Sequence, residues 1–256
     1  MIVSILNNKG GVAKTTTAVN LAAGLARRGR RVLLVDLDSQ ASASLSLGVA
    51  RNALTGAVYP ALTGAKSASS AVVEVSPGLS LLPGGPDLAA ADLLLADRAG
   101  RETALIRAIR PAVERFDVTL MDCPPSLSLL TVNALTASTG YLVPVLPHYL
   151  ALEGLAAFMV AVGQAQTRLD TSARLVGVLL ANVDRRTRAA VEVSDLVRGH
   201  FGAEVFKTEV GVNIALAEAP SFGQSIFDYA PHSRGAADYE AVTAEFVTRC
   251  KRLGVG

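Results

Sequence analysis

The chain has 256 residues, of which 50% are hydrophobic and only 5% are aromatic, with no tryptophan. This length and composition suit a sizeable aliphatic core, and we expect one α/β domain spanning residues 1–256. The formal net charge of +2 does not by itself indicate a nucleic-acid binder. Two cysteines and three separated histidines exclude a disulfide framework and the usual metal-ligand spacings.

Signals for secretion or membrane insertion are missing from the sequence. Met1 leads directly into the apolar run Ile2–Leu6, without the basic segment and cleavage pattern of a secretory signal. Every longer apolar run contains a glycine, a proline or a charge before it reaches membrane-spanning length. We therefore expect a cytoplasmic protein with no integral membrane contact.

Short apolar runs alternate along the chain with longer amphipathic stretches, as strands alternate with helices in α/β proteins. The expected strands are Ile2–Leu6, Arg31–Asp36, Leu79–Leu82, Val118–Asp122, Gly140–Val145, Leu175–Val183 and Val205–Thr208. The expected helices are Lys14–Arg28, Arg101–Arg115, Leu127–Ala137, Leu150–Leu169, Ala189–Phe201 and Arg234–Arg252. Several strands lack polar alternation, which favours a doubly wound, mostly parallel sheet flanked by helices on both faces. The segment Arg51–Ser76, rich in small residues, is expected to be a mobile or lightly packed insertion.

The turn between the first strand and the first helix has the composition of a phosphate-binding loop. Glycines allow backbone N–H groups to face phosphates, and the start of the following helix adds a favourable dipole. Lys14 is expected to reach the β- and γ-phosphates of ATP, and the Thr15 hydroxyl to bind Mg²⁺. The expected nucleotide-binding residues of this loop are Lys9, Gly10, Gly11, Val12, Ala13, Lys14, Thr15 and Thr16.

The loop departs from the common pattern GxxxxGK[ST], because Asn8 and Ala13 stand where that pattern has glycines. If Ala13 has a positive φ, its Cβ costs roughly 1–2 kcal/mol. That cost corresponds to about 5- to 30-fold in affinity if the strain is adopted on binding. We expect weakened ATP binding rather than its loss. A helix start rich in glycine and threonine, with no ligand, is the alternative.

Three acidic residues end two of the expected strands. Asp36 and Asp38 close the second strand, and Asp122 closes the Val118–Asp122 strand. Ligands bind open parallel sheets at this edge, so all three acids are expected to face the same phosphates. Phosphoryl transfer requires a metal ion and a group that holds the attacking water. A helix cap or a solvated turn is the alternative for any single one of these acids.

Four further segments, together with the loop, resemble a known family. Lys9-Gly10-Gly11-Val12-Ala13-Lys14-Thr15-Thr16, with its extra lysine five residues before the usual one, resembles the deviant Walker A loop of the ParA and MinD ATPases. The later segments resemble partition ATPases of the ParA/Soj type, in the correct order over nearly the whole chain: Asp122–Ser128, Ala151–Gly154, Glu218–Gly223 and Ser233–Ala236.

This resemblance implies a P-loop ATPase fold and particular roles for the site residues. Catalytic roles fall to Lys9, which reaches the partner's phosphates in a sandwich dimer, to Lys14, and to Asp38, which orients the water. Asp122 is implied to bind Mg²⁺ through water, and Asp36 to be a direct ligand or to lie just behind one. Asp38 is implied to belong to the same metal site. The family's DxDPQG pattern has a proline and a glycine where this chain has Ser39 and Ala41, which leaves the stiffness of this switch segment open.

The family's cycle is implied as well. ATP drives formation of a homodimer, the dimer binds DNA without sequence preference at the nucleoid, and a ParB-type centromere-binding protein stimulates slow hydrolysis and release. The sequence leaves three other interpretations open: a nucleotide-dependent clamp with little turnover, a relative that positions another cargo, and a MinD-like membrane-cycling ATPase. A MinD-like ATPase usually ends in an amphipathic helix that anchors it to the membrane. In this chain, the C-terminal stretch Phe246–Leu253 more simply predicts a helix packed on the sheet.

The family's DNA-contacting residues do not carry over, because Val212, Ala215 and Gln224 replace basic residues. A substitute cluster is expected to contact DNA phosphates non-specifically, although a solvated basic turn is the alternative. Its members are Arg185, Arg186 and Arg188, with Arg198, Lys207 and Arg234 as possible neighbours.

Residues for the adenine base are expected beyond the strand Leu175–Val183. Asn182 occupies the place where related P-loop proteins have an adenine-recognising amide, and a capping role is its alternative. The loop Val210–Asn213 is expected to offer backbone contacts to the base, with Asn213 at its end.

Overall fold

The apolar runs come together in one seven-stranded sheet, in the order β3-β4-β2-β5-β1-β6-β7. The computed structural model describes residues 1–50 and 57–255. Neighbouring strands pair in parallel, except that β3 is antiparallel to β4. The strands are β1 (Ile2–Ile5), β2 (Val32–Asp36), β3 (Val73–Ser76), β4 (Leu79–Leu82), β5 (Val118–Asp122), β6 (Gly140–Val145) and β7 (Arg174–Leu180). The predicted doubly wound, mostly parallel fold is confirmed.

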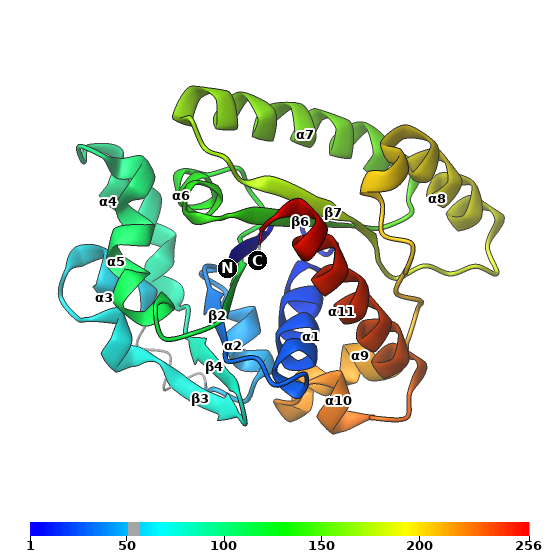
Figure 1. Ribbon diagram of the computed structural model, residues 1–256, viewed down its shortest axis with the longest axis horizontal. Coiled ribbons are helices and arrows are strands. Elements are labelled where there is room, and N and C mark those ends of the chain that lie inside the picture. Colours follow the sequence, from blue (N-terminus) through cyan, green and yellow to red (C-terminus); the bar gives the residue numbers. More distant parts are fainter. Residues whose placement is uncertain (51–56, 256) are drawn as a thin grey trace.

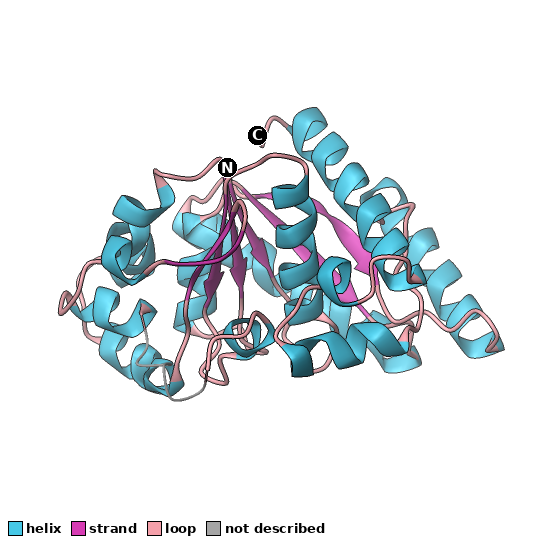
Figure 2. Ribbon diagram, turned by 90° about the horizontal axis from the view of Figure 1, so that it is seen from below, coloured by secondary structure: helices cyan, strands magenta, loops and turns pink. Residues whose placement is uncertain are grey.

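Helices cover both faces of this sheet (Figures 1 and 2). In Figure 1, α1 (Lys14–Arg27) and α11 (Arg234–Leu253) lie on one face, whereas α6 (Leu129–Ala137) and α7 (Tyr149–Leu169) lie on the other. The other helices are α2 (Ser42–Ser46), α3 (Val58–Thr63), α4 (Ala91–Ala96), α5 (Ala104–Val113), α8 (Arg188–Phe201), α9 (Ile214–Glu218) and α10 (Ile226–Tyr229). Every residue of β2 and of β5 is buried, as expected for strands covered on both faces.

Two apolar clusters fill the space between the sheet and its helices. One contains side chains of α1 and α11 such as Leu21 and Phe246. The other contains side chains of α6 and α7 such as Leu130 and Phe158. Successive side chains of a strand point to opposite faces, so Leu33 and Val35 join the second cluster while Leu34 joins the first.

The register of the central strands brings the ends of three strands to one level. Asp122 of β5 lies opposite Ile5 of β1 and also opposite Asp36 of β2. The chain leaves β1 towards α1 on one face and leaves β5 towards α6 on the other. This reversal creates the crevice in which open α/β sheets bind their ligands.

The segment predicted as a lightly packed insertion contains more structure than expected. Of Arg51–Ser76, residues 51–56 lie outside the described part, and the rest includes α3 and β3. Val58 and Leu62 of α3 are buried in the core. Strand β3 forms an antiparallel edge hairpin with β4 through the turn at Gly78, which has a φ of 78°. The prediction of a lightly packed insertion is therefore wrong for α3, whereas Thr63–Ser67 and the β3 residues Val73 and Glu74 are exposed.

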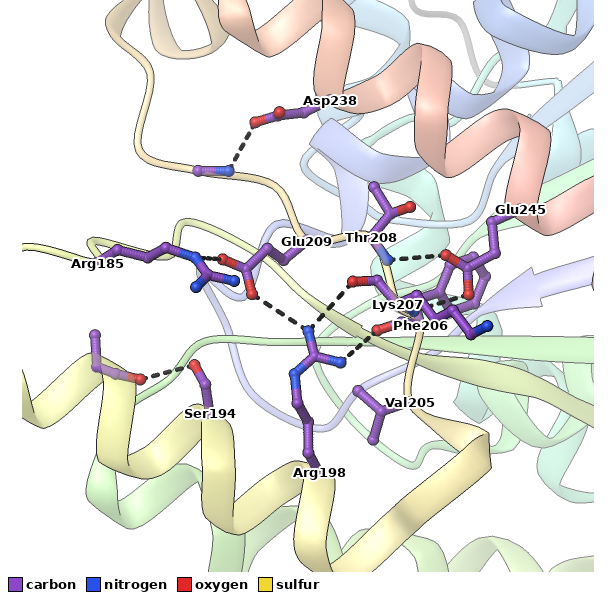
Figure 3. Close-up of polar contacts among 12 residues, drawn as sticks. Arg185, Ser194, Arg198, Val205, Phe206, Lys207, Thr208, Glu209, Asp238 and Glu245 are labelled. Atoms are coloured by element: carbon purple, nitrogen blue, oxygen red, sulfur yellow. Dashed lines mark hydrogen bonds and ion pairs between the residues drawn. The ribbon is translucent and has the colours of Figure 1, made fainter.

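The predicted strand Val205–Thr208 is also wrong, because only Val205 forms a bridge to β7. Side chains of α11 bind the backbone that a further strand would have used. The Glu245 carboxylate accepts hydrogen bonds from the backbone N–H groups of Lys207 and Thr208, each at 2.8 Å (Figure 3). The buried Arg249 guanidinium donates to the carbonyls of residues 203, 204 and 205. The segment is thus held by α11 along most of its length, and it contacts the sheet only through the Val205 bridge and a hydrogen bond from the Phe206 N–H to the Val178 carbonyl of β7 at 2.8 Å.

The final helix packs into the core, as the sequence predicts. Tyr239, Val242, Phe246 and Cys250 of α11 are buried against the sheet. Within residues 1–50 and 57–255, no helix combines the length and the apolar character needed to cross a bilayer.

Candidate nucleotide-binding site

The expected phosphate loop lies at the exit of β1 and ends in the first turn of α1. Gly11 and Ala13 both have left-handed backbones, with φ of 71° and 64°. The conformation anticipated for Ala13 is therefore present, and an L-residue pays for it in strain. Because a helix N-terminus presents unpaired N–H groups and a positive partial charge, the loop and α1 together suit an anion.

Lys14 is held inside this loop rather than extended into solvent. Its side chain is buried, and Nζ donates a hydrogen bond of 2.6 Å to the carbonyl of Lys9. Burial lowers the pKa of Lys14, while the nearby acids Asp122 and Asp38 act in the opposite direction. A desolvated ammonium group at the centre of the loop interacts strongly with any negative charge placed there.

Thr15 and Asp122 form the contact that links the loop to β5. The Thr15 hydroxyl donates to Oδ2 of Asp122 at 2.7 Å. Oδ1 of Asp122 is buried and has no hydrogen-bond partner among the described residues. Burial raises the pKa of Asp122, and the neighbouring Asp36 carboxylate raises it further. A buried carboxylate with an unsatisfied oxygen beside a hydroxyl is a donor set that Mg²⁺ prefers, so these residues fit the expected metal ion.

Asp36 is fully buried, and both of its oxygens are already used by the switch segment. Oδ1 accepts a hydrogen bond from the backbone N–H of Asp38 at 3.1 Å. Oδ2 accepts hydrogen bonds from the backbone N–H of Ser44 at 2.8 Å and from the Ser44 hydroxyl at 2.7 Å. Burial raises the pKa of Asp36 despite these hydrogen bonds. Of the two positions expected for Asp36, this arrangement favours the one behind the metal site.

The Ser44 network was missed by the sequence reasoning. Its hydroxyl also accepts from the backbone N–H of Gly84, beyond β4, at 3.2 Å. A Cβ at Gly84 would lie 2.8 Å from the Asp36 carbonyl oxygen and 2.9 Å from that of Asp38. The spacing of Asp36, Ser44 and Gly84 matches no common motif, so only the folded structure reveals that they fasten the switch segment.

Asp38 lines a cavity of about 380 Å³ that the loop borders. Its Oδ1 accepts from the backbone of Gln40 at 2.9 Å, which orients the carboxylate within the turn. The cavity is also lined by Lys14, Thr15 and Thr16. The structure thus brings Asp38 together with the loop residues, as expected of a group that acts next to the phosphates.

The residues expected to contact the base line the same cavity. Asn182 has a left-handed backbone with a φ of 54° and lines the cavity together with Val210, Gly211 and Asn213. The Asn213 side chain accepts from the backbone of Leu216 at 3.3 Å and caps α9. Its backbone therefore remains the group expected to contact the base.

The three arginines of the expected DNA-binding cluster are exposed, and each pairs with an acid. Arg185 pairs with Glu209, Arg186 with Asp184 at 2.8 Å, and Arg188 with Glu192 at 2.6 Å. Figure 3 shows Glu209 between Arg185 and Arg198. These ion pairs offset part of the positive charge that the sequence alone suggests for this cluster.

Comparisons with known proteins agree with this geometry. Residues 1–175 match the family described as AAA domain. The chromosome-partitioning ATPase Soj of Thermus thermophilus is 46% identical over 247 residues, which cover 96% of this chain and 95% of that protein. The sporulation initiation inhibitor protein Soj of Bacillus subtilis is 41% identical, with coverages of 93% and 94%.

Solved structures include relatives with bound nucleotide. The cobyrinic acid a,c-diamide synthase of Mycobacterium smegmatis, crystallised with ADP and magnesium, is 35% identical with a TM-score of 0.85, over 99% of this chain and 96% of that one. The cell division ATPase MinD of Pyrococcus furiosus is 27% identical with a TM-score of 0.77, over 96% and 98%. The prediction of ATP and Mg²⁺ as cofactors is confirmed. Sequence, fold and site together place this chain in the ParA/Soj family of partition ATPases.

Proposed function

We propose that the protein is an ATP-dependent molecular switch for DNA segregation. Mg-ATP drives two copies into a sandwich homodimer, and the dimer binds DNA without sequence preference at the nucleoid. A ParB-type centromere-binding protein then stimulates slow hydrolysis, and the DNA is released. Residues 1–256 act in this cycle as one cytoplasmic ATPase domain.

One observation carries the nucleotide part of this proposal. The unsatisfied, buried Asp122 carboxylate, the Thr15 hydroxyl bound to it and the desolvated Lys14 ammonium all belong to one site. Thr15 and Asp122 would hold Mg²⁺, which offsets the charge that develops on the phosphates. An unsatisfied buried acid is costly in a core that has only a structural purpose.

The remaining roles fall to side chains around the cavity. Lys14 binds the phosphates of its own protomer, and the first turn of α1 adds backbone donors. Asp38, fixed by its own turn and by Asp36, orients the attacking water. Lys9 acts in trans, on the phosphates bound by the second copy.

Replacement of Asp38 tests the hydrolytic role. The variant Asp38→Ala should retain Mg-ATP binding and dimerisation but lose about 100-fold or more of its turnover, as is typical when a proton-transfer or water-orienting group is removed. Steady-state phosphate release measures the effect, and Asp97→Ala, at an exposed site at the end of α4, is the control. Undiminished turnover in Asp38→Ala would remove this residue from the mechanism. Binding without turnover in the unaltered protein would favour the nucleotide-dependent clamp.

Charge reversal tests the DNA-binding role of Arg185, Arg186 and Arg188. The triple variant to Glu should lose ATP-dependent binding to DNA of any sequence at moderate salt, because phosphate contacts supply this affinity. The control variant reverses the same number of charges at exposed arginines on or next to α5: Arg107, Arg110 and Arg115. Equal DNA binding by the two variants would contradict the assignment of this cluster.

A further inference from the structure

The segment Ala151–Gly154 has no role in the proposed cycle. In the structure, the end of the Lys9 side chain lies next to Gly154 of α7. A Cβ added at Gly154 would lie 2.6 Å from Cε and 2.8 Å from Nζ of Lys9. Real Cβ atoms do not approach other atoms so closely. The end of the Lys9 side chain therefore lies across the backbone of α7 of its own chain, in space that only glycine leaves open.

The backbone of Lys9 is fixed by several hydrogen bonds, which set the point from which its side chain extends. The Lys9 N–H donates to Oδ1 of Asn7 at 3.0 Å, and the Asn7 amide donates to the Pro144 carbonyl of β6 at 2.8 Å. The Lys9 carbonyl accepts from Lys14 at 2.6 Å. These contacts tie the exits of β1 and β6 together shortly before α7 begins, which places Lys9 beside the first turns of that helix.

We propose that Gly154 forms a resting groove for the Lys9 side chain, and that dimerisation moves Lys9 from this groove to the partner's phosphates. The inference rests on the proposed ATP-driven dimer. One ammonium group cannot occupy both places, so the stability of the groove contact opposes dimerisation. The apparent dimer affinity falls with the fraction of protomers whose lysine is released. Gly154 thus sets part of the threshold for switching.

The expected size of this effect follows from the kind of contact involved. A partly exposed charged side chain that loses one favourable contact shifts such an equilibrium by about 2- to 5-fold. Each dimer requires the release of two lysines, so the dimer dissociation constant should change by about 4- to 25-fold when the groove is filled.

A methyl group tests the groove directly. In Gly154→Ala, the added Cβ displaces the flexible end of Lys9, which the fold can accept without backbone movement. The matched control is Gly163→Ala, in the same helix, where a Cβ would meet no atom within 4 Å. Both variants gain the same helix propensity, and only one touches Lys9. Thermal melting establishes that both are folded.

Two measurements give separate readouts. Sedimentation velocity with Mg²⁺ and a nonhydrolysable ATP analogue should show a dimer dissociation constant about 4- to 25-fold lower for Gly154→Ala and unchanged for Gly163→Ala. NMR of ¹³C-methylated lysines, with the Lys9 signal assigned through Lys9→Arg, should show a shifted Lys9 resonance in monomeric Gly154→Ala only.

The outcomes separate this inference from the function on which it rests. If the unaltered protein forms no nucleotide-dependent dimer, the proposed function fails. If it dimerises but the two glycine variants behave alike, the groove has no part in switching and the inference is overturned. Weaker dimerisation of Gly154→Ala would equally overturn it, because Gly154 would then accommodate Lys9 in the dimer rather than at rest.

Discussion

The methyl group of Ala13 provides a quantitative test of the loop geometry. With a φ of 64° and a ψ of 28°, the residue lies in the left-handed region, where a Cβ costs roughly 1–2 kcal/mol. Glycine removes this cost but loses about 0.5–1 kcal/mol through its greater freedom in the unfolded chain. The net expectation for Ala13→Gly is a stabilisation of up to about 1.5 kcal/mol with a midpoint of about 0.75 kcal/mol, which corresponds to about 1.5–3 °C in Tm at the midpoint for a chain of this size.

The matched control is Ala157→Gly, at an exposed position within the helix α7. There the same substitution should destabilise by about 1 kcal/mol, because glycine is a poor helix former. Differential scanning calorimetry of the two variants should therefore give shifts of opposite sign. A lower Tm for Ala13→Gly would refute the assigned backbone conformation.

Mg-ATP affinity supplies a second readout for Ala13→Gly. We expect the loop to keep its left-handed turn throughout the cycle, so the strain is common to free and bound protein and cancels from the binding free energy. The dissociation constant should then change by less than about 2-fold. A gain of 5- to 30-fold without a change in Tm would show instead that the strain is adopted on binding.

Two further substitutions test contacts that hold the site in place. Ser44→Ala removes the hydroxyl that joins Asp36 to Gly84. Urea titrations should show a loss of about 1–3 kcal/mol of unfolding free energy, and phosphate release should fall more than Mg-ATP binding. Unchanged stability and turnover would contradict the bridging role. Arg249→Met removes a buried guanidinium that pairs with Glu245 and binds three consecutive carbonyls. The free energy of unfolding, measured in the same titrations, should fall by about 3–5 kcal/mol. A loss below about 1 kcal/mol would show that other contacts hold the segment before the loop Val210–Asn213.

The sheet was predictable from the sequence because its central strands are continuous apolar runs. Strands β4, β5 and β6 have the predicted bounds. Strand β3 was missed since its residues Val73 and Glu74 are exposed at an edge, although the turn at Pro77-Gly78 between short alternating runs is a hairpin signal. The segment Val205–Thr208 was predicted to be a strand, yet Glu245 and Arg249, which follow it by 37 to 44 residues, bind that backbone.

The candidate site shows the same division between local and long-range information. The loop and the ends of β2 and β5 were predictable, because parallel strands end at one edge and the loop has a recognisable pattern. Arg185, Arg186 and Arg188 each pair with an acid, and Glu209, the partner of Arg185, is distant in the sequence. The sequence analysis therefore predicted more unpaired positive charge in this cluster than the structure contains. The proximity of Gly154 to Lys9 could not be predicted, because it depends on how the end of β6 positions the start of α7 next to the phosphate loop.

Isothermal titration of Mg-ATP tests the central claim most directly, namely that Lys14, Thr15 and the buried Asp122 hold a magnesium-bound triphosphate. We predict saturable binding of one nucleotide per chain at concentrations below about 1 mM, with affinity that falls in EDTA and in Asp122→Asn. No heat of binding at millimolar nucleotide, or equal affinity with and without Mg²⁺ and with and without Asp122, would contradict the account.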